Sequence, residues 1–195
     1  MKKVAITGGI ASGKSVILQK LMFSHYVIYS SDAIAHDVLR SEGKKEVINS
    51  FGSFILDSNN EINRKLLGEI VFNDNDKLQR LNSIIHPYVK KRIEEIIKAN
   101  PHLEIIFFEI PLLFEAHMED MFDATINIYC DIDLQIQRIV ARDGRSPEDA
   151  LKIITSQMCT NDRNKLATYA IDNSGPLEET YKKIDEVIKD ILSKE

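Results

Sequence analysis

The sequence predicts an α/β fold, in which helices surround a parallel sheet. Three observations support this fold class. A short apolar run near the N-terminus leads through a glycine-rich turn into a helical pattern, and further apolar runs of strand length alternate with helical patterns. A block of helical patterns alone separates the second run from the third. At 195 residues, the chain has the length of one domain with room for an insertion.

The glycine-rich turn is the most informative stretch of the sequence. Residues 8–15, GGIASGKS, fit the pattern G-x-x-x-x-G-K-[ST], between an apolar strand run and the helical pattern of residues 16–22. Glycines let backbone N–H groups turn inward at the positive end of a helix, where they bind phosphate. We therefore expect a nucleoside triphosphate site, with Lys14 at the β- and γ-phosphates and the Ser15 hydroxyl on Mg²⁺. An ordinary glycine-rich turn with an incidental lysine is the alternative, which the full spacing disfavours.

Composition and charge exclude several classes of partner. Hydrophobic residues make up 44% and charged residues 28% of the chain, as in an ordinary soluble globular protein. The net charge of −5 creates no basic field, so we expect no nucleic-acid partner. No apolar stretch approaches the roughly 20 residues that span a bilayer, and no signal-type segment precedes the first strand. We therefore expect a cytoplasmic protein with no membrane partner.

The cysteines and histidines predict no metal site of their own. Cys130 and Cys159 lack C-x-x-C spacing, so we expect reduced, buried thiols rather than a disulfide or zinc site. The five histidines show no paired helical spacing of the H-E-x-x-H kind. Any metal is expected to arrive with the nucleotide.

The second apolar run, residues 26–30, predicts a strand, and the pattern of residues 33–39 predicts a helix after it. Asp32 lies between the two, at the carboxyl end of the strand. Open α/β sheets bind ligands at this edge, so a catalytic carboxylate is one interpretation of Asp32. A helix N-cap is the other.

A block of helices follows the second strand. Helical spacing recurs without an intervening strand at residues 45–51, 64–72 and 88–97. The block is too long for a simple crossover, so we expect an insertion that holds a second substrate, with a helical hairpin that only packs as the alternative. Arg64 and His86-Pro87 are its candidate ligand contacts. Because proline fits a first helical turn, His86-Pro87 also predicts a helix boundary.

The third run, residues 104–109, predicts a buried strand that closes with Glu109. P-loop proteins often place an Mg²⁺-directed acid there, which makes Glu109 a candidate, with a solvated carboxylate as the alternative. Residues 124–130 predict the fourth strand, and a helix over residues 134–142 follows.

Arg138 and Arg142 are four residues apart and therefore share one face of that helix. Two guanidinium groups without a carboxylate between them suit a phosphate chain, whereas solvated surface arginines are the alternative. The turn at Gly144 and the Ser146-Pro147 helix start then predict a second helix, so the pair is a candidate lid that excludes water. Residues 168–172 predict the last strand and residues 177–192 a terminal helix.

A GTPase switch is the first alternative among P-loop proteins. It requires D-x-x-G after the third strand and N-K-x-D later in the chain. The D-x-x-G at residues 172–175 follows the wrong strand, and NKLA at residues 164–167 lacks the aspartate that reads guanine. A small-molecule kinase fits better, because the chain has a candidate for each of its parts.

The chain resembles the dephospho-CoA kinase family over nearly its whole length. Residues 7–15 are similar to the family's T-G-G-I-G-S-G-K-[ST], and Asp32 with Ile34-Ala35 is similar to its D-A-D-x-I-A-R. The most discriminating matches are Pro111-Leu112-Leu113-Phe114-Glu115 and His86-Pro87 after Leu81-Asn82. Further matches follow in the family's order at Phe51-Gly52, Asn63-Arg64, Gln137-Arg138, Arg142-Asp143, Gln157 and Ile171-Asp172-Asn173.

Four positions depart from the family's pattern. Ser30 replaces the first Asp of the D-A-D element, His36 replaces its Arg, and Thr168 stands where the family often has Asp. Ala11 replaces a loop glycine, which requires an ordinary φ and ψ there. We expect activity to survive the changes at residues 11 and 30, because Asp32 is the carboxylate that resembles the family's base.

The resemblance implies a P-loop NTPase fold with three layers, α/β/α, around a five-stranded parallel sheet. It implies transfer of the ATP γ-phosphate to the 3′-hydroxyl of dephospho-CoA, which yields coenzyme A and ADP. Within a single domain, 1–195, the core would comprise residues 1–32, 103–138 and 168–195, the helical acceptor-binding insertion about residues 33–102 and the lid about residues 139–167.

The resemblance also implies roles for individual residues. Asp32 would be the base, Lys14, Arg138 and Arg142 would stabilise the transferring phosphoryl group, and Ser15 would hold Mg²⁺. The ATP site would comprise Gly8, Gly9, Ile10, Ala11, Ser12, Gly13, Lys14, Ser15 and Val16, with Asp172 and Asn173 near adenine. The acceptor site would comprise Arg64, His86, Pro111, Leu112, Leu113 and Glu115.

ATP and dephospho-CoA are therefore the expected small-molecule partners, with Mg²⁺ as the cofactor. A kinase for another small hydroxylated acceptor, such as a nucleoside monophosphate or a sugar acid, is the alternative. We expect a monomer or a weak homo-oligomer.

Overall fold

The computed structural model describes residues 1–194 of the chain. The chain divides into two compact units: Met1–Tyr29 together with the segment from Pro101 onward, and Ser30–Asn100. The first unit contains almost all of the sheet, and the second is helical. The predicted α/β fold class is confirmed.

The sheet has five strands in the order β2-β3-β1-β4-β5. The strands are β1 Lys2–Gly8, β2 Ile28–Ser30, β3 Ile105–Glu109, β4 Ala124–Tyr129 and β5 Tyr169–Asp172. The pairs β1–β3, β1–β4 and β4–β5 are parallel, with Ala5 opposite Phe108 and Thr125. Parallel strands are buried on both faces, which explains why β1, β3 and β4 read as almost continuous apolar runs.

β2 is shorter than the predicted strand of residues 26–30. The chain is still turning after the first helix at this point, because the Tyr26 N–H donates to the Leu21 carbonyl over 3.1 Å and His25 has φ 63°. Bonding to the neighbouring strand begins at Val27, whose carbonyl accepts from the Phe107 N–H at 3.0 Å. Tyr26 instead contributes its ring, which packs edge-on against Phe107.

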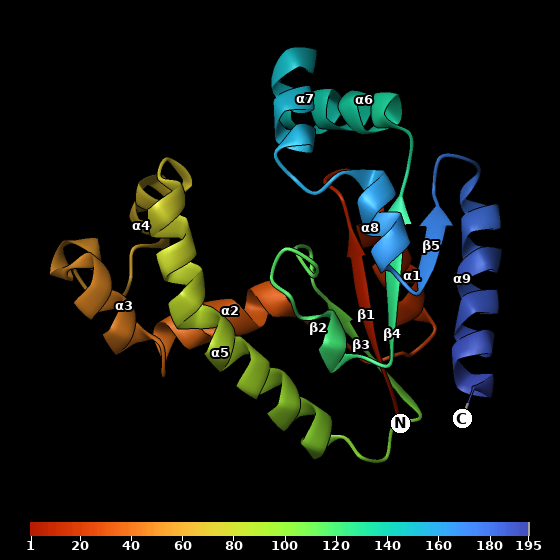
Figure 1. Ribbon diagram of the computed structural model, residues 1–195, viewed down its shortest axis with the longest axis horizontal. Helices are drawn as coiled ribbons and strands as arrows, with labels where there is room; N and C mark the ends of the chain where they lie inside the picture. Colours follow the sequence, from red (N-terminus) through yellow and green to blue (C-terminus); the bar gives the residue numbers. More distant parts are fainter. Residues whose placement is uncertain (195) are drawn as a thin grey trace. The chain divides into compact units, whose positions relative to one another are not determined.

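Helices of the first unit lie beside the sheet and beyond the ends of its strands (Figure 1). They are α1 Lys14–Phe23, α6 Ile132–Asp143, α7 Pro147–Thr155, α8 Thr160–Leu166 and α9 Leu177–Ser193. The predicted helices are confirmed, and α8 is an additional one. Its polar sequence, TNDRNKL, has no apolar period by which to predict it.

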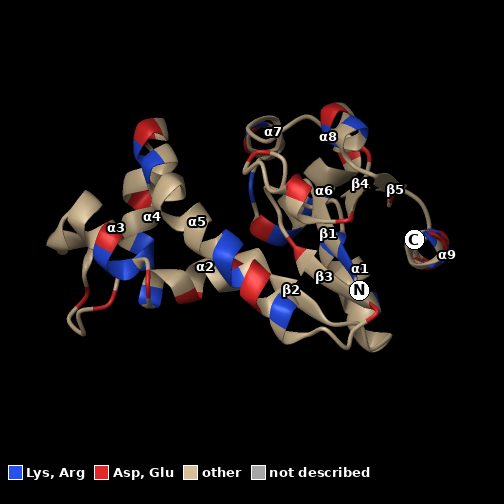
Figure 2. Ribbon diagram, turned by 60° about the horizontal axis from the view of Figure 1, so that its bottom comes forward, with Lys and Arg blue, Asp and Glu red and all other residues tan. Residues whose placement is uncertain are grey.

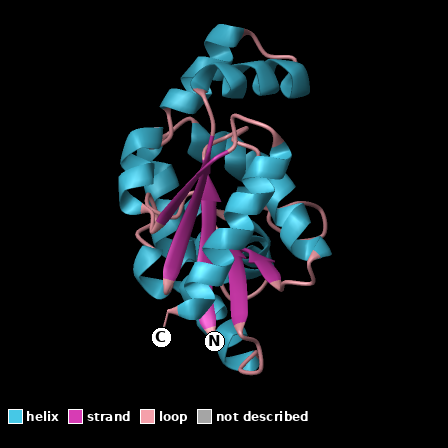
Figure 3. Cartoon of the chain, turned by 90° about the vertical axis from the view of Figure 1, so that its right-hand side faces the viewer, coloured by secondary structure: helices cyan, strands magenta, loops and turns pink. Residues whose placement is uncertain are grey.

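Helices cover both faces of the sheet (Figure 3). On one face, Ile17 of α1 and Ile184 of α9 belong to a cluster of buried side chains with Ile6, Phe107 and Ile126. On the opposite face, Asn127 of β4 donates from Nδ2 to Oδ1 of Asn164 in α8, at 2.6 Å. The three-layer α/β/α arrangement is therefore confirmed.

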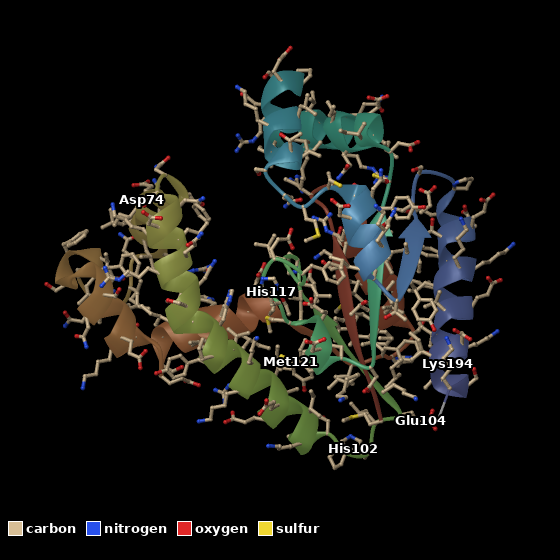
Figure 4. The ribbon with its side chains drawn as sticks, in the orientation of Figure 1. Asp74, His102, Glu104, His117, Met121 and Lys194 are labelled. Carbon is tan, nitrogen blue, oxygen red and sulfur yellow. The ribbon has the colours of Figure 1, made fainter. Side chains whose placement is uncertain are left out.

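The second unit consists of α2 Ser31–Arg40, α3 Lys44–Phe51, the 3-10 turn η1 Ser53–Ile55, α4 Arg64–Phe72 and α5 Asn75–Ala99. The long helix α5 contacts α2, α3 and α4. The Asp74 carboxylate, labelled in Figure 4, accepts from the Lys77 N–H at 3.1 Å and so caps the start of α5.

The helix boundary predicted at His86-Pro87 is wrong, because Pro87 lies inside α5. Proline removes one backbone donor and normally interrupts a helix. Here Ile85, Val89 and Ile93 are buried at helical spacing on both sides of it. The burial of one continuous apolar face favours an uninterrupted helix and outweighs the local preference of proline.

Acidic and basic side chains alternate along the helices of each unit (Figure 2). This agrees with the small net charge of −5. Among residues 1–194, no helix combines the length and the apolar character needed to cross a bilayer.

Candidate active site

The loop between β1 and α1 presents four unpaired backbone amides. Within the described residues, the N–H groups of Ala11, Gly13, Lys14 and Ser15 have no hydrogen-bond acceptor. Lys14 and Ser15 open α1, and the first amides of a helix have no partner within the helix. These four donors lie at the positive end of the helix, where an anion is favoured.

Two side chains of α6 and one from the loop after β5 hold the carbonyl groups of the same loop. Gln135 Nε2 donates to the Ile10 oxygen at 2.7 Å, Arg138 Nη1 to the Ala11 oxygen at 3.1 Å, and Asn173 Nδ2 to the Ser12 oxygen at 2.9 Å. In a trans peptide, the carbonyl and the following N–H point in opposite directions. The bonds to the Ile10 and Ser12 carbonyls therefore turn the N–H groups of Ala11 and Gly13 away from the supporting side chains.

Gly13 is required by this geometry. It has φ 89°, in the left-handed region, and a Cβ on it would lie 2.0 Å from Asn173 Nδ2. Asn173 is buried, and besides its bond to the loop it accepts from Thr180 Oγ1 at 3.1 Å. The loop, β5 and α9 are thus packed with no room for a side chain at residue 13.

Ala11 does not have the ordinary backbone angles that we expected. Its φ of 57° lies in the left-handed region, where a Cβ is strained by roughly 1–2 kcal/mol. Three hydrogen bonds hold the loop in this shape. The Ala11 carbonyl accepts from Arg138, and the carbonyls before and after it accept from Gln135 and Asn173. The alanine therefore carries strain that a glycine would not.

We expect Ala11→Gly to raise the free energy of unfolding by about 0.5–1 kcal/mol. Glycine relieves the left-handed strain, and its greater freedom in the unfolded chain offsets part of the gain. Thermal unfolding followed by circular dichroism should show a melting temperature higher by about 2 °C. Ala35→Gly, within α2, is the control and should lower it. A lower melting temperature of the Ala11→Gly variant would show that Ala11 is not strained.

Lys14 and Glu109 form an ion pair at the base of the loop. Both side chains are largely shielded from solvent. Glu109 closes β3, as predicted, so the acid at the strand end lies beside the P-loop lysine. Ser12 Oγ nearby is buried and has no partner within the described residues. The site thus combines one exchangeable ion pair with unpaired donors.

The residues around the loop suit a magnesium nucleotide rather than a bare metal ion. Nowhere in residues 1–194 do three His, Cys, Asp or Glu side chains gather as a metal site would require. Ser15 offers one exposed hydroxyl at the start of α1. A Mg²⁺ bound at Ser15 would take its other ligands from polyphosphate oxygens and water.

A cavity of about 540 Å³ opens beside the loop. The predicted residues Ser15, Arg138, Arg142 and Asn173 line it, together with the apolar side chain of Leu177. Its volume is that of a small-molecule site, and its lining joins cationic groups to apolar ones. The structure therefore brings together the P-loop, both predicted arginines and the loop after β5.

The two arginines differ in how they are held. Arg138 is fixed by bonds to the Ala11 carbonyl, to Cys130 Sγ at 3.5 Å and to the Asn173 carbonyl at 3.4 Å. Arg142 is exposed and makes two bonds to Asp143, at 2.7 and 2.8 Å, so it has a carboxylate partner that we did not expect. These bonds hold the pKa of the Asp143 carboxyl below its usual value.

Of the cysteines, only Cys130 is buried as expected, and burial raises the pKa of its thiol. Cys159 is exposed, which corrects the prediction. It precedes α8, and its sulfur accepts from the Asp162 N–H at 3.4 Å. Its sulfur therefore caps α8 instead of packing in the core.

The segment Pro111–Glu115 follows β3 and has mixed exposure. The Pro111 carbonyl accepts from Thr7 Oγ1 at 3.1 Å, and Leu112 is exposed. Leu113 is fully buried, so its side chain supports the segment from within the core. Glu115 pairs with the buried Arg163 at 3.4 Å.

Asp32, Arg64 and His86 belong to the second unit. Asp32 is the second residue of α2 and Ser30 is the N-cap, so the N-cap interpretation of Asp32 is wrong. Its side chain is exposed. Within residues 1–194, its carboxylate makes no hydrogen bond or ion pair. Arg64 is exposed at the start of α4. The pKa of His86 is lowered, mainly by burial and to a smaller extent by the positive charge of Lys90.

Sequence reasoning missed Gln135 and Arg163 and assigned no role to Gln157. Gln135 occupies the buried face of α6, four residues before the buried Ile139. A glutamine on an otherwise apolar helix face is the one signal that could have identified it, since buried amides need partners. Arg163 has no such signal, because α8 lacks an apolar period.

Comparisons with known proteins identify the family of the chain. The family model for dephospho-CoA kinase matches residues 2–179. A dephospho-CoA kinase of Fusobacterium nucleatum is 39% identical over 183 residues, covering 93% of this chain and 94% of that protein. A solved dephospho-CoA kinase from Campylobacter jejuni is 28% identical, with a TM-score of 0.73 and coverage of 97% and 96%. TT1252 from Thermus thermophilus is also 28% identical, with a TM-score of 0.83 over 97% of both chains.

Proposed function

The chain belongs to the dephospho-CoA kinase family, and on this premise we propose which of its residues carry each part of the reaction. The chain is a kinase that catalyses the last step of coenzyme A biosynthesis, and it uses ATP. The proposed transfer is of the ATP γ-phosphate to the 3′-hydroxyl of dephospho-CoA, with ADP as the second product.

The loop Gly8–Ser15 and Val16 bind the triphosphate in this proposal. The unpaired amides of Ala11, Gly13, Lys14 and Ser15 support it, because a phosphate chain supplies acceptors for all four. Ser15 would hold Mg²⁺, which would neutralise charge between phosphates when bound. Asp172 and Asn173 would lie near adenine, and the cavity beside Arg138 and Arg142 supports this assignment.

Lys14, Arg138 and Arg142 stabilise the negative charge of the transferring phosphoryl group. Lys14 is paired with Glu109, and its ammonium has three donors, so it could contact phosphate oxygens beside this carboxylate. Arg138 is positioned in advance by the loop carbonyl, which limits the reorganisation needed during transfer. Arg142 bonds Asp143 through Nε and Nη2, which leaves its Nη1 group to donate to phosphate.

Asp32 accepts the proton of the acceptor hydroxyl or orients that hydroxyl for attack. Its exposed carboxylate is free of intramolecular bonds within residues 1–194, as a base that meets substrate must be. Arg64, His86 and the segment Pro111–Glu115 form the acceptor side. A neutral His86 at pH 7, as its lowered pKa implies, would donate one hydrogen bond and accept another.

The helical unit Ser30–Asn100 is proposed to bind the acceptor, and the helices over about residues 139–167 are proposed to act as the lid. Closure of a lid excludes water, which otherwise competes for the phosphoryl group. We also propose a cytoplasmic location, a monomer or weak homo-oligomer, and no nucleic-acid or membrane partner.

The set of four unpaired amides beside Lys14 is the observation that carries the proposed mechanism. Its test is incubation with Mg·ATP and a panel of acceptors: dephospho-CoA, a nucleoside monophosphate and a sugar acid. We expect ADP release and a new phosphate on the ribose 3′-oxygen with dephospho-CoA alone, detected by mass spectrometry and phosphorus NMR. Preferential phosphorylation of the nucleoside monophosphate would refute the choice of acceptor.

A further inference from the structure

Two glutamines hold opposite ends of one residue in the phosphate-binding loop. The Ile10 N–H donates to Gln157 Oε1 at 2.9 Å, and the Ile10 carbonyl accepts from Gln135 Nε2 at 2.7 Å. A backbone N–H can only donate and a carbonyl can only accept, so the orientation of both amides is determined by their partners. Gln157 must present its oxygen and Gln135 its nitrogen.

The two glutamines come from the elements of the proposed lid and its base. Gln135 lies in α6, and Gln157 lies between the end of α7 at Thr155 and the start of α8 at Thr160. Gln135 is buried, with 3% of its surface exposed, so its bond to the loop is shielded from competing water. The loop is therefore attached at the same residue to both ends of the α6–α7 helix pair.

The glutamines also approach the residue before Ile10. A Cβ added to Gly9 would lie 3.1 Å from Gln135 Nε2, 3.6 Å from Gln157 Oε1 and 3.0 Å from Arg163 Nη1. These side chains approach the loop closely at Gly9, and together with Gly9 they line a cavity of about 500 Å³. The first half of the loop is thus confined by side chains, whereas its second half is confined by the start of α1.

The bond from Gln135 also fixes the direction of one of the four unpaired N–H groups. The peptide that joins Ile10 to Ala11 contributes the Ile10 carbonyl, held by Gln135, and the Ala11 N–H, one of the four unpaired donors. Because the peptide is planar, a rotation that breaks the Gln135 bond also turns the Ala11 N–H. Ala11 has strained backbone angles. Loss of the Gln135 bond would therefore let the loop relax into a less strained conformation.

We propose that Gln135 and Gln157 are positioning residues, a two-point clamp on Ile10 that keeps the loop in its triphosphate-binding shape. The inference deepens the proposed function, on which it rests, by naming residues that act on ATP through the loop and not on the acceptor. It also links the lid to the loop, since Gln157 can hold Ile10 only when the segment after α7 is in place.

The test uses one substitution at two positions with opposite expected results. Gln157→Glu keeps an oxygen that accepts from the Ile10 N–H, whereas Gln135→Glu replaces the donor with a carboxylate that faces a carbonyl. Both add the same charge beside the same residue, so any repulsion of the triphosphate is similar. Gln157→Leu removes the acceptor without adding charge, and Gln137→Leu, on the exposed side of α6, is the matched control.

We expect Gln157→Leu and Gln135→Glu to weaken Mg·ATP binding about tenfold, measured by isothermal titration calorimetry without acceptor, as the loss of one hydrogen bond implies. Gln157→Glu should recover most of the loss seen in Gln157→Leu, and Gln137→Leu should bind like the wild type. In steady-state assays of the full chain, KM for ATP should rise about tenfold while KM for dephospho-CoA changes less than about twofold.

Equal weakening by Gln157→Glu and Gln157→Leu would overturn the clamp, since the effect would not depend on an acceptor. So would unchanged ATP binding in Gln157→Leu, or a lower melting temperature with both KM values unchanged, which marks a purely structural role. If Gln135→Glu does not fold, the two Gln157 variants alone decide. A wild-type chain inactive with dephospho-CoA would contradict the proposed function instead, and ATP binding would still test the clamp.

Discussion

Replacing Lys14 by alanine should lower kcat for phosphoryl transfer by about 10³-fold or more, which corresponds to about 4 kcal/mol in the activation barrier. Lys14 is the one lysine of the loop and the first residue of α1. Its ion pair with Glu109 holds the ammonium at the positive end of this helix. Its removal deprives the β- and γ-phosphates of their direct positive partner in the transition state. A coupled assay of ADP release with saturating dephospho-CoA measures the loss.

Lys20→Ala is the matched control for this prediction. Lys20 lies on the same helix and also forms an ion pair, with Asp185 of α9, so its loss tests the general effect of removing such a pair. We expect kcat of this variant to stay within about twofold of the wild type. Circular dichroism should show that both variants are folded. A Lys14→Ala enzyme with a near-normal rate would contradict the assigned role.

Asp32→Asn should lower kcat by about 10²-fold or more and leave nucleotide affinity little changed. Asparagine has nearly the same shape and still accepts a hydrogen bond, but it cannot take a proton from the acceptor hydroxyl. Asp32 lies in the first turn of α2, where loss of its charge costs about 0.3–1 kcal/mol of helix stability. The fold should therefore persist. Rapid-quench kinetics with bound ATP and saturating acceptor separate the chemical step from binding.

Asp37→Asn, an exposed aspartate on the same helix, is the control for the change of charge and should keep its rate. Turnover of Asp32→Asn at the wild-type rate would remove Asp32 from the mechanism. A loss confined to KM for dephospho-CoA would make Asp32 an acceptor-binding residue rather than a base, because a base is needed only in the chemical step.

Local signals were sufficient for most secondary structure. The five strands and the helices α1, α2, α3, α4, α6, α7 and α9 could be predicted because each has an apolar period, a cap or a glycine turn within its own residues. Pro87 was misread because its local preference competes with a buried face formed by residues far away in the sequence. The helix α8 could not be predicted, because its sequence has no apolar period.

The candidate site was predictable to the same extent. Residues 8–15 carry their chemistry in their spacing, since one loop supplies both the amides and Lys14. The left-handed angles of Ala11 were not predictable, because they depend on side chains of α6 and of the loop after β5 that hold the neighbouring carbonyls. The Asp143 partner of Arg142 is adjacent in sequence and was nevertheless missed, since adjacent residues pair only in particular rotamers.

By itself, the sequence determined the fold class, the phosphate-binding loop and the resemblance from which the family and its reaction followed, because these depend on residue types at fixed spacing along the chain. Only the tertiary structure decided which side chains support that loop, and it brought Gln135 and Gln157 to Ile10 and Asn173 to Ser12. Hydrogen bonds between residues more than a hundred positions apart depend on how the strands are ordered and packed. No local pattern encodes that order.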